Sequence, residues 1–161
     1  MNNKVKICSI FSQSKVEVTD ELKLSIQIII EELIVKHNFG IFCFSGLSDF
    51  DKLCWNIISK YKLKYKNVYR IFCVDTLTDL NNSYLIPMSS VLFDNYVYFD
   101  YNIPQKNNYT KKIIVMSLNS DYSIFYVNKL IKSNISKVYK KLIVFKKNIV
   151  NLYWLYFLVF V

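Results

Sequence analysis

Residues 41–74 decide the fold, and their sequence is IFCFSGLSDFDKLCWNIISKYKLKYKNVYRIFCV. The apolar run Ile41–Ser45 predicts a buried strand. In the turn that follows, Ser48 and Asp51 have the spacing of a capping box, with Asp in the place usually taken by Glu. Apolar residues at helical spacing come next, and Val68–Val74 is again an apolar run. The stretch therefore predicts a strand, a helix and a second strand.

The same alternation extends toward the N-terminus. Lys4–Phe11 is a short apolar run that predicts a buried strand. Thr19 can cap a helix over residues 20–37, which has acidic residues in its first turn. Gly40 is expected to end this helix in a left-handed conformation. A β-α-β-α-β order predicts an α/β fold with a parallel sheet, and an α+β fold with antiparallel pairing is the alternative.

The C-terminal half is expected to continue the pattern after a long connection. Thr76–Gln105 contains both prolines and is expected to be a loop or insertion with one extra strand at Val91–Phe99. The remaining predicted elements are a helix over Lys106–Leu118, a strand over Asp121–Val127 and a helix over Ser133–Lys147.

Length and charge narrow the class of protein. The 161 residues match one domain, residues 1–161, and a hydrophobic fraction of 53% excludes disorder. The net charge of +9 permits an anionic partner, but the lysines are scattered and Arg70 is the only arginine. Specific nucleic-acid readers favour the bidentate guanidinium, so this composition argues against nucleic-acid binding. Drift of an AT-rich genome explains the basic charge equally well.

The cysteines point to a reducing compartment. Three of the four lie in apolar runs and no CxxC pair occurs, so we expect no metal site. Nothing in the sequence calls for a cofactor. The N-terminal residues MNNKVK lack the pattern of a signal peptide. We therefore expect a cytoplasmic protein.

Residues 149–161 combine a last strand with an apolar extension. A membrane span needs about 20 apolar residues, and extending this segment backwards meets Lys146 and Lys147. We therefore expect the extension to pack on the domain or on a partner rather than enter a membrane. A homo-oligomer is one way to cover it.

Four stretches occur in an order known from one family. They are FSGLSDFDKLCW at 44–55, KYKLKYKNVYRIFCV at 60–74, KNNYTKKIIVMSLNSDYSIFYV at 106–127 and KSNISKVY at 132–139. Their order resembles the SLOG superfamily, in its branch of small uncharacterised bacterial proteins, over most of the chain. The resemblance implies a Rossmann-like three-layer fold with a mostly parallel central sheet. It also implies a nucleotide or nucleotide-derived ligand at the carboxyl ends of the strands.

The sequence departs from the family where the ligand is expected. Ser12 and Gln13 stand where the family has a Gly-His pair, and Ser45 stands at a family glycine, although Gly46 is adjacent. The turn at Ser45 and Gly46 precedes a helix, whose free N–H groups and dipole attract an anion. A plain helix start capped by Ser48 is the alternative.

Four further residues are candidates to contact the ligand. Lys112 keeps the charge of a family Arg-Asn pair and could bind a phosphate, or it could be a solvated surface lysine. Ser133 and Asn134 fall on the family's last phosphate-binding turn, where Asn replaces Gly, and an ordinary N-cap is the alternative. Asp51 could accept a hydrogen bond from a ligand hydroxyl, although completing the capping box is favoured.

Three functions follow as hypotheses. The first is a domain that binds or senses a nucleotide-derived ligand. The second is a hydrolase of a nucleotide N-glycosidic or phosphate bond, with Asp51 or Asp100 as the acid–base group. The Pro-Gly-Gly-x-Gly-Thr motif of enzymes in the wider superfamily is missing here, which argues against it. The third is a structural or interaction protein that has lost its ligand.

Overall fold

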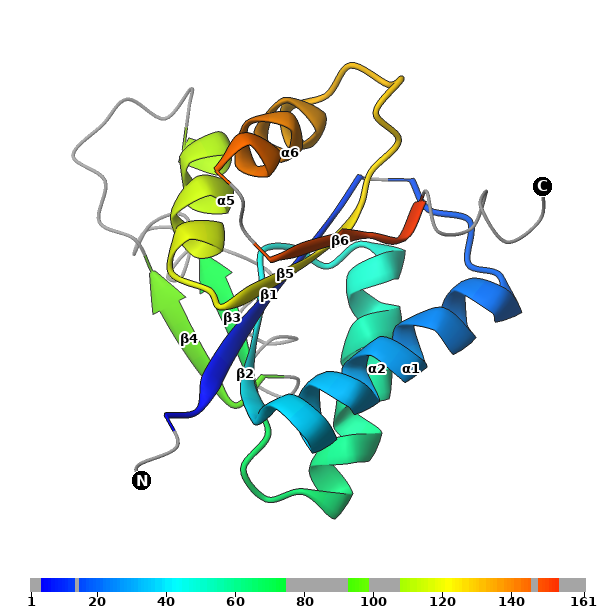
Figure 1. Cartoon of the computed structure of the whole chain (residues 1–161), viewed down its shortest axis with the longest axis vertical. Helices are drawn as coiled ribbons and strands as arrows, with labels where there is room; N and C mark the ends of the chain where they lie inside the picture. Colours follow the sequence, from blue (N-terminus) through cyan, green and yellow to red (C-terminus); the bar gives the residue numbers. More distant parts are fainter. Residues whose placement is uncertain (1–3, 14, 75–92, 99–107, 146–147, 154–161) are drawn as a thin grey trace.

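The computed structural model describes residues 4–13, 15–74, 93–98, 108–145 and 148–153. These residues form an α/β fold in which a six-stranded sheet carries helices on both faces (Figure 1). The strand order is β4-β3-β2-β1-β5-β6, and every pairing between described strands is parallel. The expected Rossmann-like three-layer α/β fold is confirmed, and the antiparallel alternative is wrong.

The strands are β1 (Lys6–Ser12), β2 (Phe39–Phe44), β3 (Tyr69–Val74), β4 (Asn95–Tyr98), β5 (Tyr122–Tyr126) and β6 (Ile149–Asn151). The helices are α1 (Asp20–His37), α2 (Asp49–Lys64), α5 (Asn108–Leu118) and α6 (Asn134–Val144). Each predicted element that falls on described residues is present, with ends shifted by a few residues at most sites.

The end of α1 differs from the prediction. Asn38, not Gly40, takes the left-handed conformation, with φ of 59°. Asn tolerates this conformation better than most residues other than glycine. Gly40 lies inside β2. A side chain is not tolerated at this position, because a Cβ there would be 2.4 Å from the backbone oxygen of Asn67. The glycine therefore permits a close approach between two chain segments and does not end the helix.

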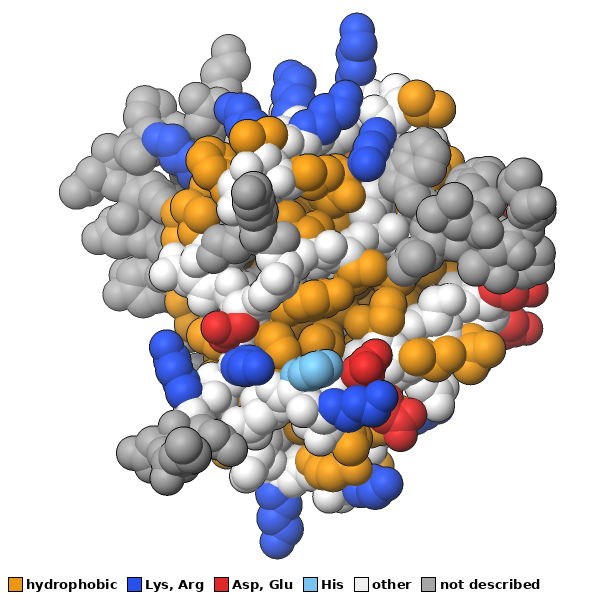
Figure 2. Space-filling model, in the orientation of Figure 1, with side chains coloured by type: hydrophobic (Ala, Val, Ile, Leu, Met, Phe, Trp, Pro, Cys, Tyr) orange, Lys and Arg blue, Asp and Glu red, His pale blue; other side chains and the backbone are white. Residues whose placement is uncertain are grey.

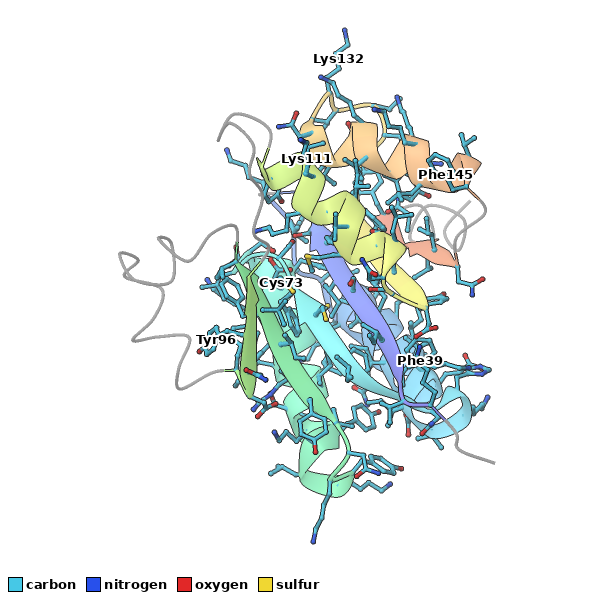
Figure 3. The ribbon with its side chains drawn as sticks, turned by 90° about the vertical axis from the view of Figure 1, so that its left-hand side faces the viewer. Phe39, Cys73, Tyr96, Lys111, Lys132 and Phe145 are labelled. Carbon is cyan, nitrogen blue, oxygen red and sulfur yellow. The ribbon has the colours of Figure 1, made fainter. Side chains whose placement is uncertain are left out.

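Two hydrophobic layers cover the sheet. Helices α1 and α2 pack on one face, and α5 and α6 pack on the other (Figures 1 and 3). The alternation along β1 shows the division, because Cys8 and Ile10 join the core under α1 and α2 whereas Phe11 joins the core under α5 and α6. Phe11 packs on Phe125 of β5, with ring centroids 4.9 Å apart.

The path of the chain creates a switch point beside β1. From β1 the chain moves outward through β2 and β3 to β4, and then returns to the other side of β1 as β5 and β6. The loop after β1 leads to α1 on one face, and the loop after β5 leads to α6 on the opposite face. Such a divergence leaves a crevice at the carboxyl ends of the two strands, where α/β folds bind their ligands.

Two predicted regions are only partly described. The strand expected within Val91–Phe99 is present as β4, and most of the rest of Thr76–Gln105 lies outside the described residues. Strand β6 has only three residues, and the extension beyond Tyr153 lies outside the described residues. Among the helices that the structure describes, none has the length and hydropathy to cross a bilayer.

Candidate functional site

A cleft of about 490 Å³ opens at the switch point. Its volume lies in the range of small-molecule sites. The described residues that line it come from the end of β1 and the loop after it, the start of α5, and the loop before α6 with the first turn of that helix. They are Ser12, Gln13, Lys15, Tyr109, Ile131, Ser133, Asn134 and Ile135.

Gln13 ties the two walls of the cleft together. Its Oε1 accepts a hydrogen bond from the Asn128 backbone N–H at 3.0 Å, and its Nε2 donates to the Asn128 carbonyl at 3.2 Å. Nε2 also lies 3.3 Å from the Ser133 hydroxyl oxygen, to which it donates. The Gln13 side chain therefore fixes the loop after β5 against the end of β1.

The N-terminus of α6 opens on the cleft without a carboxylate. Ser133 caps the helix, and it shares a capping box with Ser136, whose N–H donates to the Ser133 hydroxyl at 3.1 Å. The first turn of α6 contains no acidic residue. Asn134 and Ile135, which line the cleft, belong to the turn whose N–H groups have no partner within the helix. The helix dipole there is free to attract an anion.

The N-terminus of α2 is built differently. Ser48 and Asp51 form the predicted capping box, in which Asp51 Oδ2 accepts from the Ser48 N–H at 2.9 Å and from its hydroxyl at 2.7 Å. Asp49 places a second carboxylate in the same turn. These charges already compensate the helix dipole, so an anion gains less here than at α6. The favoured capping interpretation of Asp51 is confirmed.

Lys112 is buried behind this turn. Its side chain extends from α5, is 4% exposed, and donates a hydrogen bond from Nζ to the Ser45 carbonyl at 3.1 Å. Nζ also lies 5.4 Å from the ring centroid of Tyr109. The interpretation of Lys112 as a solvated surface lysine is therefore wrong. The ammonium instead holds the carbonyl at the end of β2.

Asp51 combines burial with an unused oxygen. The residue is 4% exposed, and its Oδ1 has no hydrogen-bond partner. Burial raises the pKa of this carboxyl above its ordinary value, and the hydrogen bonds from Ser48 and the charge of Lys112 offset part of that increase. Gly46 leaves room beside this carboxylate, because a Cβ there would lie 3.2 Å from Asp51 Oδ2.

A hydrogen bond joins the buried turn to the cleft. The hydroxyl oxygens of Ser12 and Ser48 are 2.7 Å apart, and Ser12 lines the cleft. The sequence candidates therefore divide into two groups. Those on the cleft wall are Ser12, Gln13, Ser133 and Asn134. Those behind it are Ser45, Gly46, Asp51 and Lys112. Asp100 lies outside the described residues.

Sequence analysis missed several lining residues. Lys15 lies in the same loop as Ser12 and Gln13, so its position after the first strand could have indicated it. Tyr109 precedes Lys112 by three residues on α5, which places both on one face of that helix. Ile131 and Ile135 carry no comparable signal, because an isoleucine in a sequence is usually assigned to the core.

The charge around the cleft is basic. Between residues 108 and 145 the only carboxylate side chain is Asp121, and its Oδ2 accepts from the Ile7 N–H at 2.9 Å, at the opposite end of the sheet. Lysine side chains gather over α6 and the loop before it (Figure 2), and Lys132 projects outward from that loop (Figure 3). This end of the molecule therefore favours anionic ligands.

The only arginine is not part of this surface. Arg70 on β3 pairs with Asp94, with 3.1 Å between the guanidinium Nη2 and the carboxylate Oδ1, and lies 4.8 Å from the Trp55 ring centroid.

The described residues include no cluster of three or more His, Cys, Asp or Glu side chains suited to a metal ion. No protein-family model matches this chain, and a search of curated proteins finds no significant match.

Proposed function

We propose that this chain is a binding or sensing domain for a nucleotide or nucleotide-derived anion. The ligand occupies the cleft between the ends of β1 and β5, with a phosphate at the first turn of α6. The observation that carries the proposal is that this turn opens on the cleft with no carboxylate of its own. Unpaired N–H groups and an uncompensated dipole form the standard anion site of α/β folds.

The rest of the cleft suits the other end of such a ligand. Tyr109 and Ile131 offer aromatic and aliphatic surface, and Ser12 and Asn134 offer polar groups. A mostly apolar lining with a few polar groups is typical of pockets that hold a base or sugar. The order of motifs that resembles the SLOG superfamily agrees with this ligand class, and membership of that superfamily is part of the proposal.

A thermal-shift screen tests the proposal. The purified chain is heated with nucleotides, cyclic nucleotides and ADP-ribose derivatives, with nucleosides and inorganic phosphate as controls. A ligand that binds only the folded state stabilises it by about 2.7 kcal/mol at a hundred times its Kd. We expect a phosphorylated ligand to raise the melting temperature more than its nucleoside does. If the folded protein responds to no member of the panel, the result would contradict this proposal and favour a structural or interaction protein that has lost its ligand.

A further inference from the structure

Three side chains form a hydrogen-bonded chain from the cleft into the protein. Ser12 Oγ lies 2.7 Å from Ser48 Oγ, and Ser48 Oγ lies 2.7 Å from Asp51 Oδ2. Only Ser12 of the three lines the cleft. The capping box explains the contact between Ser48 and Asp51, but it does not require the contact with Ser12.

The number of protons available fixes which side chain donates in each of these hydrogen bonds. Ser48 Oγ accepts from the Asp51 N–H at 3.1 Å and has a single proton of its own. An ionised Asp51 can only accept, so it takes the Ser48 proton. Ser48 must then accept from Ser12. The Ser12 proton therefore points away from the cleft, and the oxygen lone pairs of Ser12 remain for the contents of the cleft.

Asp51 can act as the proton acceptor at the end of the chain. It is 4% exposed and its Oδ1 has no partner, so the carboxylate has fewer hydrogen bonds than helix capping could supply. Burial raises its pKa, which makes the ionised form a stronger base. Among the described residues, two titratable groups interact with it: Lys112 from α5, which lowers its pKa, and Cys54 on α2.

We propose that Ser12 is a nucleophile, and that Ser48 and Asp51 form the relay that takes up its proton during attack on a phosphoryl group in the cleft. Ser12 Oγ forms the bond to phosphorus, and the bond from phosphorus to the leaving oxygen breaks with its electron pair. The Ser12 proton passes to Ser48 Oγ as the Ser48 proton passes to Asp51 Oδ2. A buried base that activates a hydroxyl is the general arrangement of nucleophilic catalysis.

The cleft also supplies charge stabilisation for this step. The first turn of α6 and the side chain of Lys15 line the same cavity as Ser12. N–H groups and an ammonium stabilise the negative charge that builds up on phosphoryl oxygens. Ser48 and Asp51 do not line the cleft, so they act through Ser12 as positioning and proton-accepting residues.

An alkyl fluorophosphonate tests the relay without any nucleotide. Attack by Ser12 forms an oxygen–phosphorus bond and releases fluoride, and mass spectrometry of peptides locates the adduct. We expect an adduct on Ser12 that is absent in Ser12→Ala and unchanged in rate in Ser25→Ala, a serine variant on α1. Asp51→Asn keeps the shape and the acceptor oxygen of the cap but removes the base. We expect it to slow labelling at least tenfold.

The pH profile separates a relay from a merely structural role. Labelling of the wild-type chain should fall as the pH falls through the raised pKa of Asp51, and labelling of Asp51→Asn should be flat over that range. If Asp51→Asn does not fold, Ser48→Ala and Ser48→Thr give the same test, since only Thr restores a hydroxyl. No adduct on Ser12 of the folded chain, or equal rates in wild type and Asp51→Asn, would overturn the relay. Ser12 labelling with no response to nucleotides would reject only the proposed ligand class.

Discussion

Helices α2 and α6 begin with the same kind of cap but differ in the charge of their first turns. Each starts at a serine N-cap with a reciprocal capping box, Ser48 with Asp51 and Ser133 with Ser136. The first turn of α2 carries two carboxylates, and its box lies behind the cleft wall with Lys112 buried beside it. The first turn of α6 carries none and opens on the cleft.

The difference predicts that an anion binds at a helix N-terminus only where the helix's own side chains leave the dipole uncompensated. At α2 the carboxylates stabilise the helix and also repel a phosphate. At α6 the cap is neutral, and the surrounding surface is basic. The two helix starts therefore differ in charge, and the consequence of each charge can be tested separately.

The largest expected effect is at the buried lysine. Lys112→Ala removes the ammonium that holds the Ser45 carbonyl and the positive charge that lowers the pKa of Asp51. We expect the free energy of unfolding to fall by about 3 kcal/mol, because a buried carbonyl and a buried carboxylate lose a charged partner. Urea denaturation measures the loss, with Lys141→Ala on the exposed side of α6 as the matched control. Equal losses in the two variants would contradict the buried role.

Exchanging the charge at the first residue of each helix tests directly whether the difference between α2 and α6 decides where an anion binds. Asn134 of α6 and Asp49 of α2 occupy the same position after their caps. Asn134→Asp should weaken a phosphorylated ligand about tenfold or more, because like charges a few ångströms apart repel strongly in a cleft. Asp49→Asn should leave the affinity unchanged. Calorimetric titration with the best ligand of the panel measures both, and a similar loss in both variants would show that the ligand does not bind at α6.

A smaller effect is expected at the α6 cap. Ser133→Ala removes the acceptor for the Ser136 N–H and for Gln13 Nε2. The expected loss is about 1 kcal/mol of unfolding free energy, which is typical of an N-cap. Ser133→Asp should restore the cap while placing a charge in the cleft. Thermal denaturation should therefore give a higher melting temperature for Ser133→Asp than for Ser133→Ala. The affinity for a phosphorylated ligand should not be higher in Ser133→Asp, because its carboxylate repels the phosphate.

The smallest expected effect is a change in the pH dependence of stability. Because burial raises the pKa of Asp51 in the folded chain, the native state holds this proton more tightly than the unfolded state. The stability that protonation contributes is present below the unfolded value, about 3.9, and is lost as the pH rises through the raised folded value. Asp51→Asn should lack this decline. Parallel slopes for the two proteins between pH 4 and pH 7 would contradict it.

Local patterns predicted the elements well. The capping spacing at Ser48 and Asp51, and Thr19 before α1, placed two helix starts correctly because caps depend on neighbours within one turn. Gly40 misled because its role depends on Asn67, a residue distant in sequence. Asn38, not Gly40, takes the left-handed conformation that ends α1.

The site was predictable only in part, for a topological reason. Residues at strand ends were identified, but which of them share a cavity depends on the strand order, which periodicity does not contain. The sequence does not distinguish Lys112 from the adjacent Lys111, and only the packing of α5 on the sheet buries Lys112. The role of Lys15 likewise follows from the placement of β5 beside β1.

The position of β1 in the middle of the sheet has a consequence for how the chain is made. Its neighbour β2 is separated from it by one helix, whereas the bond from Ile7 of β1 to Asp121, the residue before β5, spans 114 positions of the sequence. Strands β1 to β3 with α1 and α2 can pair while the chain is still being synthesised. The cleft, in contrast, needs residues from both ends of that separation. The cleft is therefore expected to form late, because a ribosome-bound chain that has not yet released α6 can form a partial sheet but not this cleft.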